Sequence, residues 1–282
     1  MIDDLTFVMP SRNDNYSCRD RGSQDEQIKK VMLSIRSAER NFPGSKFILV
    51  EFCPLPGKPR YKDILPKING LKILTLGKDL DKVLLEDSQI PSMNFYEHLS
   101  KHMGIGISET EHFIVINQET ILPSLGRDDL LRALYEGTIT LSYKCKVSYD
   151  LIDNSVDDII DMFEKEETPT ITEKGAWGNG DFLGMSKNTY NEIGGLLMAH
   201  QNWGVDNEIL LRAGISNMDP LAARGPYNFS RNYSFYCLDH VTDGQDRPSV
   251  GNCSNPWARG AKPISLEIVG RLDEFIEEIT EL

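Results

Sequence analysis

The sequence lacks any long hydrophobic run. None of its apolar stretches approaches the ~18 consecutive residues that a membrane-spanning helix requires, so we expect no integral membrane segment. The first twelve residues, MIDDLTFVMPSR, contain no basic region, no long apolar segment and no small-residue cleavage site. They are therefore unlike a secretory signal, which favours a cytoplasmic protein.

Cysteine is scarce and shows no pairing pattern. Five cysteines occur, at positions 18, 53, 145, 237 and 253, and no two of them form a CxxC motif. An odd number with this spacing argues against a disulfide framework and against a zinc site built on thiolates. We expect most of them to be small buried residues in a reducing compartment.

Clustered positive charge is also missing. The formal net charge is −13, with 30 lysines and arginines scattered among 43 aspartates and glutamates. Such a chain repels duplex nucleic acid on average, so we expect no nucleic-acid partner. A phosphate group can still bind as part of a small ligand in a local pocket.

What the sequence does contain is an alternation of strand-like and helix-like segments. At 282 residues, 40% hydrophobic and 26% charged, it has the balance of a globular protein. Strands are predicted at 5–9, 46–52, 71–76 and 113–116, and helices at 24–40, 94–107 and 127–137. Alternation of this kind predicts an α/β fold, with a mostly parallel central sheet flanked by helices in a single domain.

The second half is less regular. Strands are predicted at 138–143, 181–186 and 233–238, and helices at 187–195 and 206–214, the last capped by Asp206. Residues 146–175 are acidic and are interpreted as an inserted surface segment. The tail, 263–282, has helical spacing of its apolar residues and predicts one amphipathic C-terminal helix.

Polar side chains follow three of the predicted strands. Ser11, Arg12 and Asn13 follow the first strand, Glu51 ends the second, and Asn117-Gln118-Glu119 follow the fourth. Ligands of open parallel sheets bind beyond the carboxyl ends of the strands, so we expect these side chains to lie along one edge. Carboxylate and amide oxygens there suit a hard divalent cation, which would be bound by the protein on one side and by a diphosphate on the other.

Six segments taken in order resemble the GT-A glycosyltransferases. They are SRNDNYS, FILVEFCPLPGKP, the stretch from NFYEHLSKH to FIVINQETIL, WGNGDFLGMSKNTYNEIGG, NWGVDNEILLRA and FYCLDH, spanning about residues 5 to 245. The resemblance implies a GT-A-like, Rossmann-type fold with a nucleotide-binding half (1–120), an acceptor-binding half (121–262) and the C-terminal helix (263–282).

The resemblance also implies roles for particular residues. Asp206 is the expected catalytic base, with Glu208 as the second choice. Glu119 and His240 are expected to bind a divalent cation, Mn²⁺ or Mg²⁺. The expected nucleotide-binding residues are Ser11, Arg12, Asn13, Glu51, Lys101 and Asn117, and the expected substrate-binding residues are Gly180, Asp181, Trp203 and Gly204. The implied reaction transfers a sugar from a UDP- or GDP-linked donor to a hydroxyl of a glycan or small molecule, with inversion.

One departure from the family pattern keeps other interpretations open. The DxD motif of the family is here Asn117-Gln118-Glu119, so its first acid is a neutral amide. A degenerate domain that binds nucleotide sugars or glycans without turnover is therefore a second hypothesis. A nucleotidyltransferase is a third, although the loop after the first strand is poor in glycine.

Overall fold

The structure is a computed structural model that describes residues 4–12, 24–88, 95–165, 171–177, 181–200, 205–214, 226–238 and 262–282. Within these ranges the side chains of residues 24, 171–177 and 205–207 are not described. Three described cysteines, Cys53, Cys145 and Cys237, are free thiols.

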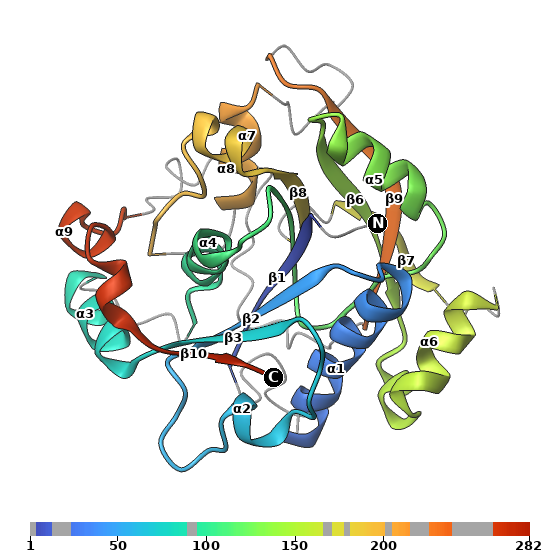
Figure 1. Cartoon of the computed structure of the whole chain (residues 1–282), viewed down its shortest axis with the longest axis horizontal. Helices are drawn as coiled ribbons and strands as arrows, with labels where there is room; N and C mark the ends of the chain where they lie inside the picture. The colour runs from blue at the N-terminus through green and yellow to red at the C-terminus, as the bar shows by residue number, and fades with distance from the viewer. Residues whose placement is uncertain are drawn as a thin grey trace.

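Ten strands of the described residues form one sheet (Figure 1). They are β1 (Leu5–Ser11), β2 (Lys46–Phe52), β3 (Leu71–Leu76), β4 (His112–Ile116), β5 (Thr120–Ile121), β6 (Ile139–Val147), β7 (Ile171–Trp177), β8 (Phe182–Ser186), β9 (Phe229–Leu238) and β10 (Ile276–Glu281). Their order is β10-β3-β2-β1-β4-β8-β6-β9-β5, with β7 paired to β6. The expected parallel pairing is confirmed at the centre, from β3 to β4. Strands β8 and β10 run antiparallel to their neighbours in that central group.

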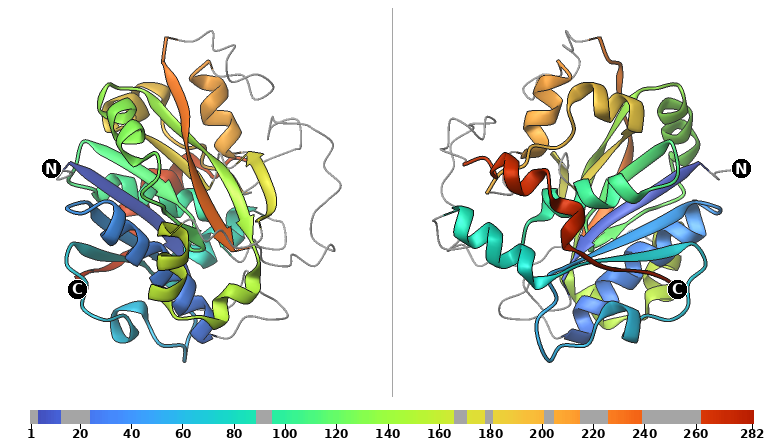
Figure 2. Two further views of the ribbon diagram at one scale, coloured as in Figure 1. Left: turned by 90° about the vertical axis from the view of Figure 1, so that its right-hand side faces the viewer. Right: turned by 60° about the vertical axis from the view of Figure 1, so that its left-hand side comes forward.

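Helices cover both faces of this sheet, as predicted for an α/β fold. They are α1 (Gln24–Asn41), α2 (Tyr61–Ile64), α3 (Lys78–Ser88), α4 (Glu97–Ile107), α5 (Arg127–Tyr135), α6 (Val156–Glu164), α7 (Lys187–Ile193), α8 (Val205–Arg212) and α9 (Leu266–Val269), with 3₁₀ turns η1 (Tyr149–Asp153) and η4 (Leu272–Phe275). One face carries α3, α4, α7, α8 and α9, and the other carries α1, α2 and α5 (Figure 2). We call these the α4 face and the α1 face.

Strand alternation assigns each side chain to one of these faces. In β1, Leu5, Phe7 and Met9 join the core of the α1 face, and Val8 joins the core of the α4 face. This period of two follows from the pleat of a strand. Continuing it past Met9 sends Ser11 to the α1 face and Arg12 to the α4 face.

Helix α4 packs very closely on β1 and β2. A Cβ placed on Gly104 would lie 2.4 Å from Val8 Cγ1 and 2.8 Å from Val50 Cγ2. Only glycine leaves room for this approach, so the helix sits deeper against the sheet than a larger residue would allow. Its other side chains are brought correspondingly near the ends of β1 and β4.

Three predictions about the second half were wrong in detail. The tail is not one helix: Gly270 ends the short helix α9, and Ile276–Glu281 form β10, antiparallel to β3. The segment 146–175 is not merely a surface insertion, because α6 packs on α1 through Ile159 and Phe163 and β7 pairs with β6. Helix α8 begins at Val205, so Asp206 lies inside its first turn and is not the N-cap.

Candidate active site

The predicted strand-end residues do not form a single group, because the pleat divides them between the two faces. Ser11, Glu51 and Gln118 contact residues of α1 or α2 on the α1 face. Asn117 contacts Lys101 of α4 on the opposite face. Arg12 also belongs to that face, since its charge acts on Cys53 and on Asp81 of α3.

On the α1 face, Ser11 is held inside the protein. Its Oγ donates to Gln118 Oε1 at 2.7 Å and lies 2.7 Å from the hydroxyl of Tyr61. Ser11 is fully buried and Gln118 is 2% exposed. These contacts join β1, the end of β4 and α2, so they fix the strand ends in place and do not present groups to a ligand.

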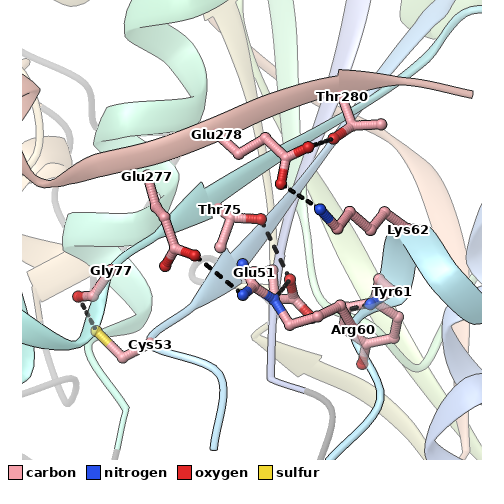
Figure 3. A network of polar contacts seen from close by, with 10 residues as sticks. All are labelled: Glu51, Cys53, Arg60, Tyr61, Lys62, Thr75, Gly77, Glu277, Glu278 and Thr280. Carbon is pink, nitrogen blue, oxygen red and sulfur yellow. Dashed lines mark hydrogen bonds and ion pairs between the residues drawn. The ribbon is translucent and has the colours of Figure 1, made fainter.

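Glu51 is likewise a fully buried carboxylate with several donors (Figure 3). Its Oε1 accepts from the backbone N–H of Tyr61 at 2.9 Å. Its Oε2 accepts from Arg60 Nε at 3.0 Å and from Thr75 Oγ1 at 3.2 Å. Arg60 also reaches Glu277 of β10. The expected role of Glu51, accepting a hydrogen bond from a nucleotide base, would require it to exchange these partners, because none of its surface is open to solvent.

The α4 face carries a chain of charged and polar groups that crosses from α4 to β6. Lys101 Nζ donates to Asn117 Oδ1 at 2.9 Å and to Glu97. Asn117 Nδ2 donates to Asp181 Oδ1 at 2.6 Å, and Lys144 Nζ donates to Asp181 Oδ2 at 2.5 Å. We call Glu97, Lys101, Asn117, Asp181 and Lys144 the polar relay. Three of its members were predicted site residues: Lys101, Asn117 and Asp181.

Sheet register explains why residues so far apart in sequence meet here. Ile116 of β4 is paired with Phe182 of β8, which places Asn117 opposite Asp181. Leu183 of β8 pairs with both Val115 and Leu141. Since β8 is antiparallel to both β4 and β6, those two strands run the same way. Lys144, three residues beyond Leu141, therefore reaches the same carboxyl edge.

Lys144 lies in a strongly anionic surrounding. Burial disfavours its charge, but the nearby carboxylates of Asp181 and Glu119 outweigh burial and raise the pKa of its ammonium group. The side chains of Lys144 and Asp181 are 13% and 24% exposed, so the pair still borders solvent. Lys144 stays protonated at any physiological pH. It was not predicted from the sequence, where it directly follows the strand predicted at 138–143.

A divalent cation can be tested against the donor set of the described residues. Asp181 has both oxygens engaged, one by the amide of Asn117 and one by Lys144. Glu119 is buried, and its negative charge acts on the same ammonium group. Among the residues that the structure describes, no group of three histidines, cysteines or acids could hold a metal ion. This described donor set does not suit a hard divalent cation, because the ammonium group of Lys144 is bonded to one of the two carboxylates and lies near the other.

Several predicted residues lie outside the described parts of the chain: Asn13, Gly180, Trp203, Gly204 and His240. Asp206 is described only as a backbone position in α8, a helix that packs on the α4 face through Ile209 and Leu210. Glu208, the second choice as base, is paired with Arg212, which in turn donates to the carbonyls of Ile193 and Gly195. Glu208 therefore holds α8 against the end of α7.

A cavity of about 850 Å³ lies at the same edge of the sheet, at the ends of β2 and β3. Its lining includes Pro54, Lys58, Gly77, Arg271 and Glu277. It contains no member of the polar relay, from which strand β1 separates it. The cavity and the relay are thus two places along one edge, and the relay is the one that holds Lys101 and Asp181, two of the predicted site residues.

No family model matches the sequence, and neither does any curated protein. Structures of nucleotide-sugar transferases are among the solved structures that are similar to this one. The mannosyltransferase PcManGT of Pyrobaculum calidifontis, solved with GDP-Man and Mn²⁺, has a TM-score of 0.45 at 11% identity, over 86% of this chain and 58% of its own. Glucosyl-3-phosphoglycerate synthase of Mycobacterium tuberculosis, solved with Mg²⁺ and UDP, has a TM-score of 0.44 at 12% identity, over 87% and 73%.

The S. aureus TarS fragment 1–349 has a TM-score of 0.44 at 10% identity, over 83% of this chain and 60% of its own. The chain thus spans less than two thirds of two of these three structures. At this identity and TM-score the similarities assign no activity to the chain.

Within the described residues, no helix combines the length and the apolar character that crossing a bilayer demands.

Proposed function

We propose that the protein transfers a sugar from a nucleoside diphosphate sugar to an acceptor hydroxyl, at the carboxyl edge of β1, β4 and β6. The observation that carries the proposal is the polar relay. It brings Lys101, Asn117 and Asp181 together at the edge where parallel sheets bind ligands. It also lies on the face that carries Arg12 and α8.

In this proposal the two halves of the chain share one reaction. Residues 1–120 hold the nucleotide, and the carboxylate of Asp181 accepts hydrogen bonds from hydroxyls of the donor sugar. Asp206, in the first turn of α8, removes the proton from the acceptor hydroxyl. The acceptor oxygen forms a bond to the anomeric carbon as the bond to the diphosphate breaks, and the electron pair leaves with the phosphate oxygen. Attack from the face opposite the leaving group inverts the anomeric configuration.

The relay offers an anionic sugar donor two ammonium groups and one amide as hydrogen-bond donors, beside the carboxylates of Glu97 and Asp181. The departing diphosphate gains negative charge in the transition state, and preorganised donors near that charge lower the barrier. Lys101 is fully buried and Asn117 is half-buried between two charged groups, so both are held in fixed positions. UDP- or GDP-linked sugars are the proposed donors, and a glycan or small molecule in the cytoplasm is the proposed acceptor.

The test begins with binding and continues to turnover. UDP, GDP, CDP and dTDP are compared by thermal shift, and donors carrying the nucleotide that binds are then assayed for release of nucleoside diphosphate. Asp206→Asn is expected to abolish steady release, while Glu208→Gln is the matched control on the same helix and is expected to retain it. The configuration of the product, read by NMR, is expected to be inverted relative to the donor.

The binding-only hypothesis predicts a different result. A degenerate domain would give a thermal shift with one nucleotide but no release that depends on Asp206. No shift with any of the four nucleotides would reject the transferase hypothesis and favour a degenerate domain that binds glycans.

A further inference from the structure

Lys144 brings an ammonium group near Glu119, one of the two residues that the family resemblance leads one to expect as ligands of a divalent cation. Its ammonium group donates to Asp181 at 2.5 Å, and Glu119 acts on it as a second negative charge. Glu119 is the one acid that the sequence keeps at the DxD position, and Asn117 replaces the other. Compared with the DxD pattern, the described site thus has one carboxylate fewer, and it has a lysine ammonium group bonded to a neighbouring acid.

The ammonium group is able to reach a ligand as well as the protein. An ammonium group has three N–H donors; Asp181 accepts from one of them and the thiol of Cys237 is a second partner, which leaves the third donor for a ligand. The side chain is 13% exposed and borders Asp181, whose side chain is 24% exposed. A diphosphate bound at this edge can therefore accept a charge-assisted hydrogen bond from Lys144 without breaking the ion pair.

Lys101 adds a second fixed positive charge on the other side of Asn117. It is fully buried, and its ammonium group is held by Asn117 at 2.9 Å and by Glu97. Of the two lysines, Lys144 is the one whose side chain borders solvent, because the side chain of Lys101 is only 1% exposed. Lys101 orients Asn117, and Lys144 is the group available to an entering anion.

We propose that Lys144 binds the diphosphate of the donor and supplies the positive charge that stabilises its departure, so that donor binding needs no divalent cation. This inference rests on the proposed function. No proton moves to or from Lys144: the sugar–oxygen bond breaks, the electron pair stays on the diphosphate, and the ammonium group neutralises part of the new charge.

The first experiment uses the unaltered protein, so its result does not depend on a variant folding. UDP and GDP are titrated by calorimetry in buffer containing EDTA and in buffer containing Mn²⁺. The nucleotide that binds is expected to have the same Kd in the two buffers within about threefold. Binding that occurs only with Mn²⁺ would overturn the inference and leave the proposed function standing. Absence of binding in both buffers would reject the proposed function, and the inference with it.

The second experiment assigns the charge to Lys144. In EDTA, Lys144→Met is expected to weaken binding of the nucleotide by about tenfold or more, as for loss of one charge-assisted hydrogen bond. Lys144→Arg keeps the charge and is expected to bind more tightly than Lys144→Met. The matched control is Lys67→Met, an exposed lysine before β3 at the opposite edge of the sheet, which is expected to bind as the wild type does.

A purely structural salt bridge would give another pattern. Lys144→Met would then lower the melting temperature but leave the Kd in EDTA unchanged, and that result would refute the proposed role. Should Lys144→Met fail to fold, Lys144→Arg is measured in EDTA instead. Its Kd is compared with the Kd of the wild type measured with excess phosphate as a competitor. A Kd of Lys144→Arg that is no tighter than this value would count against the role of Lys144.

Discussion

Glu51 illustrates how a single buried residue can connect four elements. Its carboxylate at the end of β2 accepts from Arg60 and the N–H of Tyr61 at the start of α2, and from Thr75 of β3. Arg60 carries the connection on to Glu277 of β10. Removing the negative charge leaves buried donors without an acceptor, and breaking a buried pair in this way costs several kcal/mol.

We therefore predict that Glu51→Gln lowers the free energy of unfolding by about 3 kcal/mol, measured by urea denaturation. The matched control is Glu277→Gln, which removes the other acid bonded to Arg60. Its side chain is 50% exposed, and exposed pairs contribute little, so its effect is expected to stay below about 1 kcal/mol. Equal effects of the two substitutions would show that burial does not decide the strength of this network.

Asn117 offers a test of the charge pattern at the candidate site. Its Nδ2 donates to Asp181 at 2.6 Å. In Asn117→Asp an oxygen replaces that nitrogen, so two carboxylates oppose each other at hydrogen-bonding distance. Like charges at such a distance are destabilising, and a divalent cation relieves the repulsion.

We predict that Asn117→Asp melts at a lower temperature than the wild type in EDTA and gains stability when Mn²⁺ is added. The wild type is expected to show no comparable Mn²⁺ dependence. The measurement is a thermal melt of both proteins across a Mn²⁺ titration. A wild type that is stabilised by Mn²⁺ as strongly as the variant would contradict the prediction.

At the scale of elements, the depth of α4 depends on one glycine. Gly104 faces Val8 and Val50 at distances that no Cβ tolerates, and Gly106, on the same helix, has nothing within 4 Å of its would-be Cβ. The two residues are therefore a natural pair of variants: they share helix propensity and differ in packing.

Gly104→Ala is predicted to destabilise the protein by about 1–3 kcal/mol through overpacking. Gly106→Ala is predicted to stabilise it by about 0.5–1 kcal/mol, because alanine favours the helix. Urea denaturation of both variants checks the sign. Since α4 carries Lys101, Gly104→Ala is also expected to weaken nucleotide binding, which Gly106→Ala should leave unchanged.

The elements of the first half could be predicted because their signals are local. Buried runs such as FIVI and helical spacing such as that of Ile28, Val31 and Ile35 need no knowledge of distant residues. The prediction of a single C-terminal helix was wrong because the apolar residues of the tail fit a helical period. In the structure, β10 alternates half-buried and exposed residues against the edge of β3. Only the presence of that edge selects the strand.

The site was only partly predictable for a similar reason. The rule that ligands bind beyond the carboxyl ends of strands predicted Asn117 and Arg12 as site residues. The same rule grouped Glu51 with them, although the pleat of β2 turns Glu51 to the other face. Lys144 lies on β6, and the groups that donate to Glu51 lie at the start of α2 and on β3. No local sequence pattern predicts contacts between such distant segments. The position of a residue after a strand predicts the edge of the sheet at which it lies. The alternation of side chains along the strand decides which face of the sheet it points to.

For the molecule as a whole, β10 forms the outermost strand at one side of the sheet, where the end of the described chain pairs with β3. The edge that it covers contains Ile73 and Leu74, both fully buried. An uncovered strand of this kind presents unpaired backbone groups and apolar side chains, which promote association between molecules. β10 also contributes two ion pairs, Glu277 with Arg60 and Glu278 with Lys62.

Deleting residues 276–282 is predicted to lower the melting temperature and to make the protein associate, seen as larger species by size exclusion with light scattering. The double substitution Glu277→Gln with Glu278→Gln is the control, because it removes both ion pairs and keeps the strand. It is expected to retain the wild-type elution profile. If the double variant associates as the deletion does, the ion pairs and not the covered edge keep the molecules apart. If only the deletion associates, backbone pairing of β10 is what protects the half of the sheet that is proposed to hold the nucleotide.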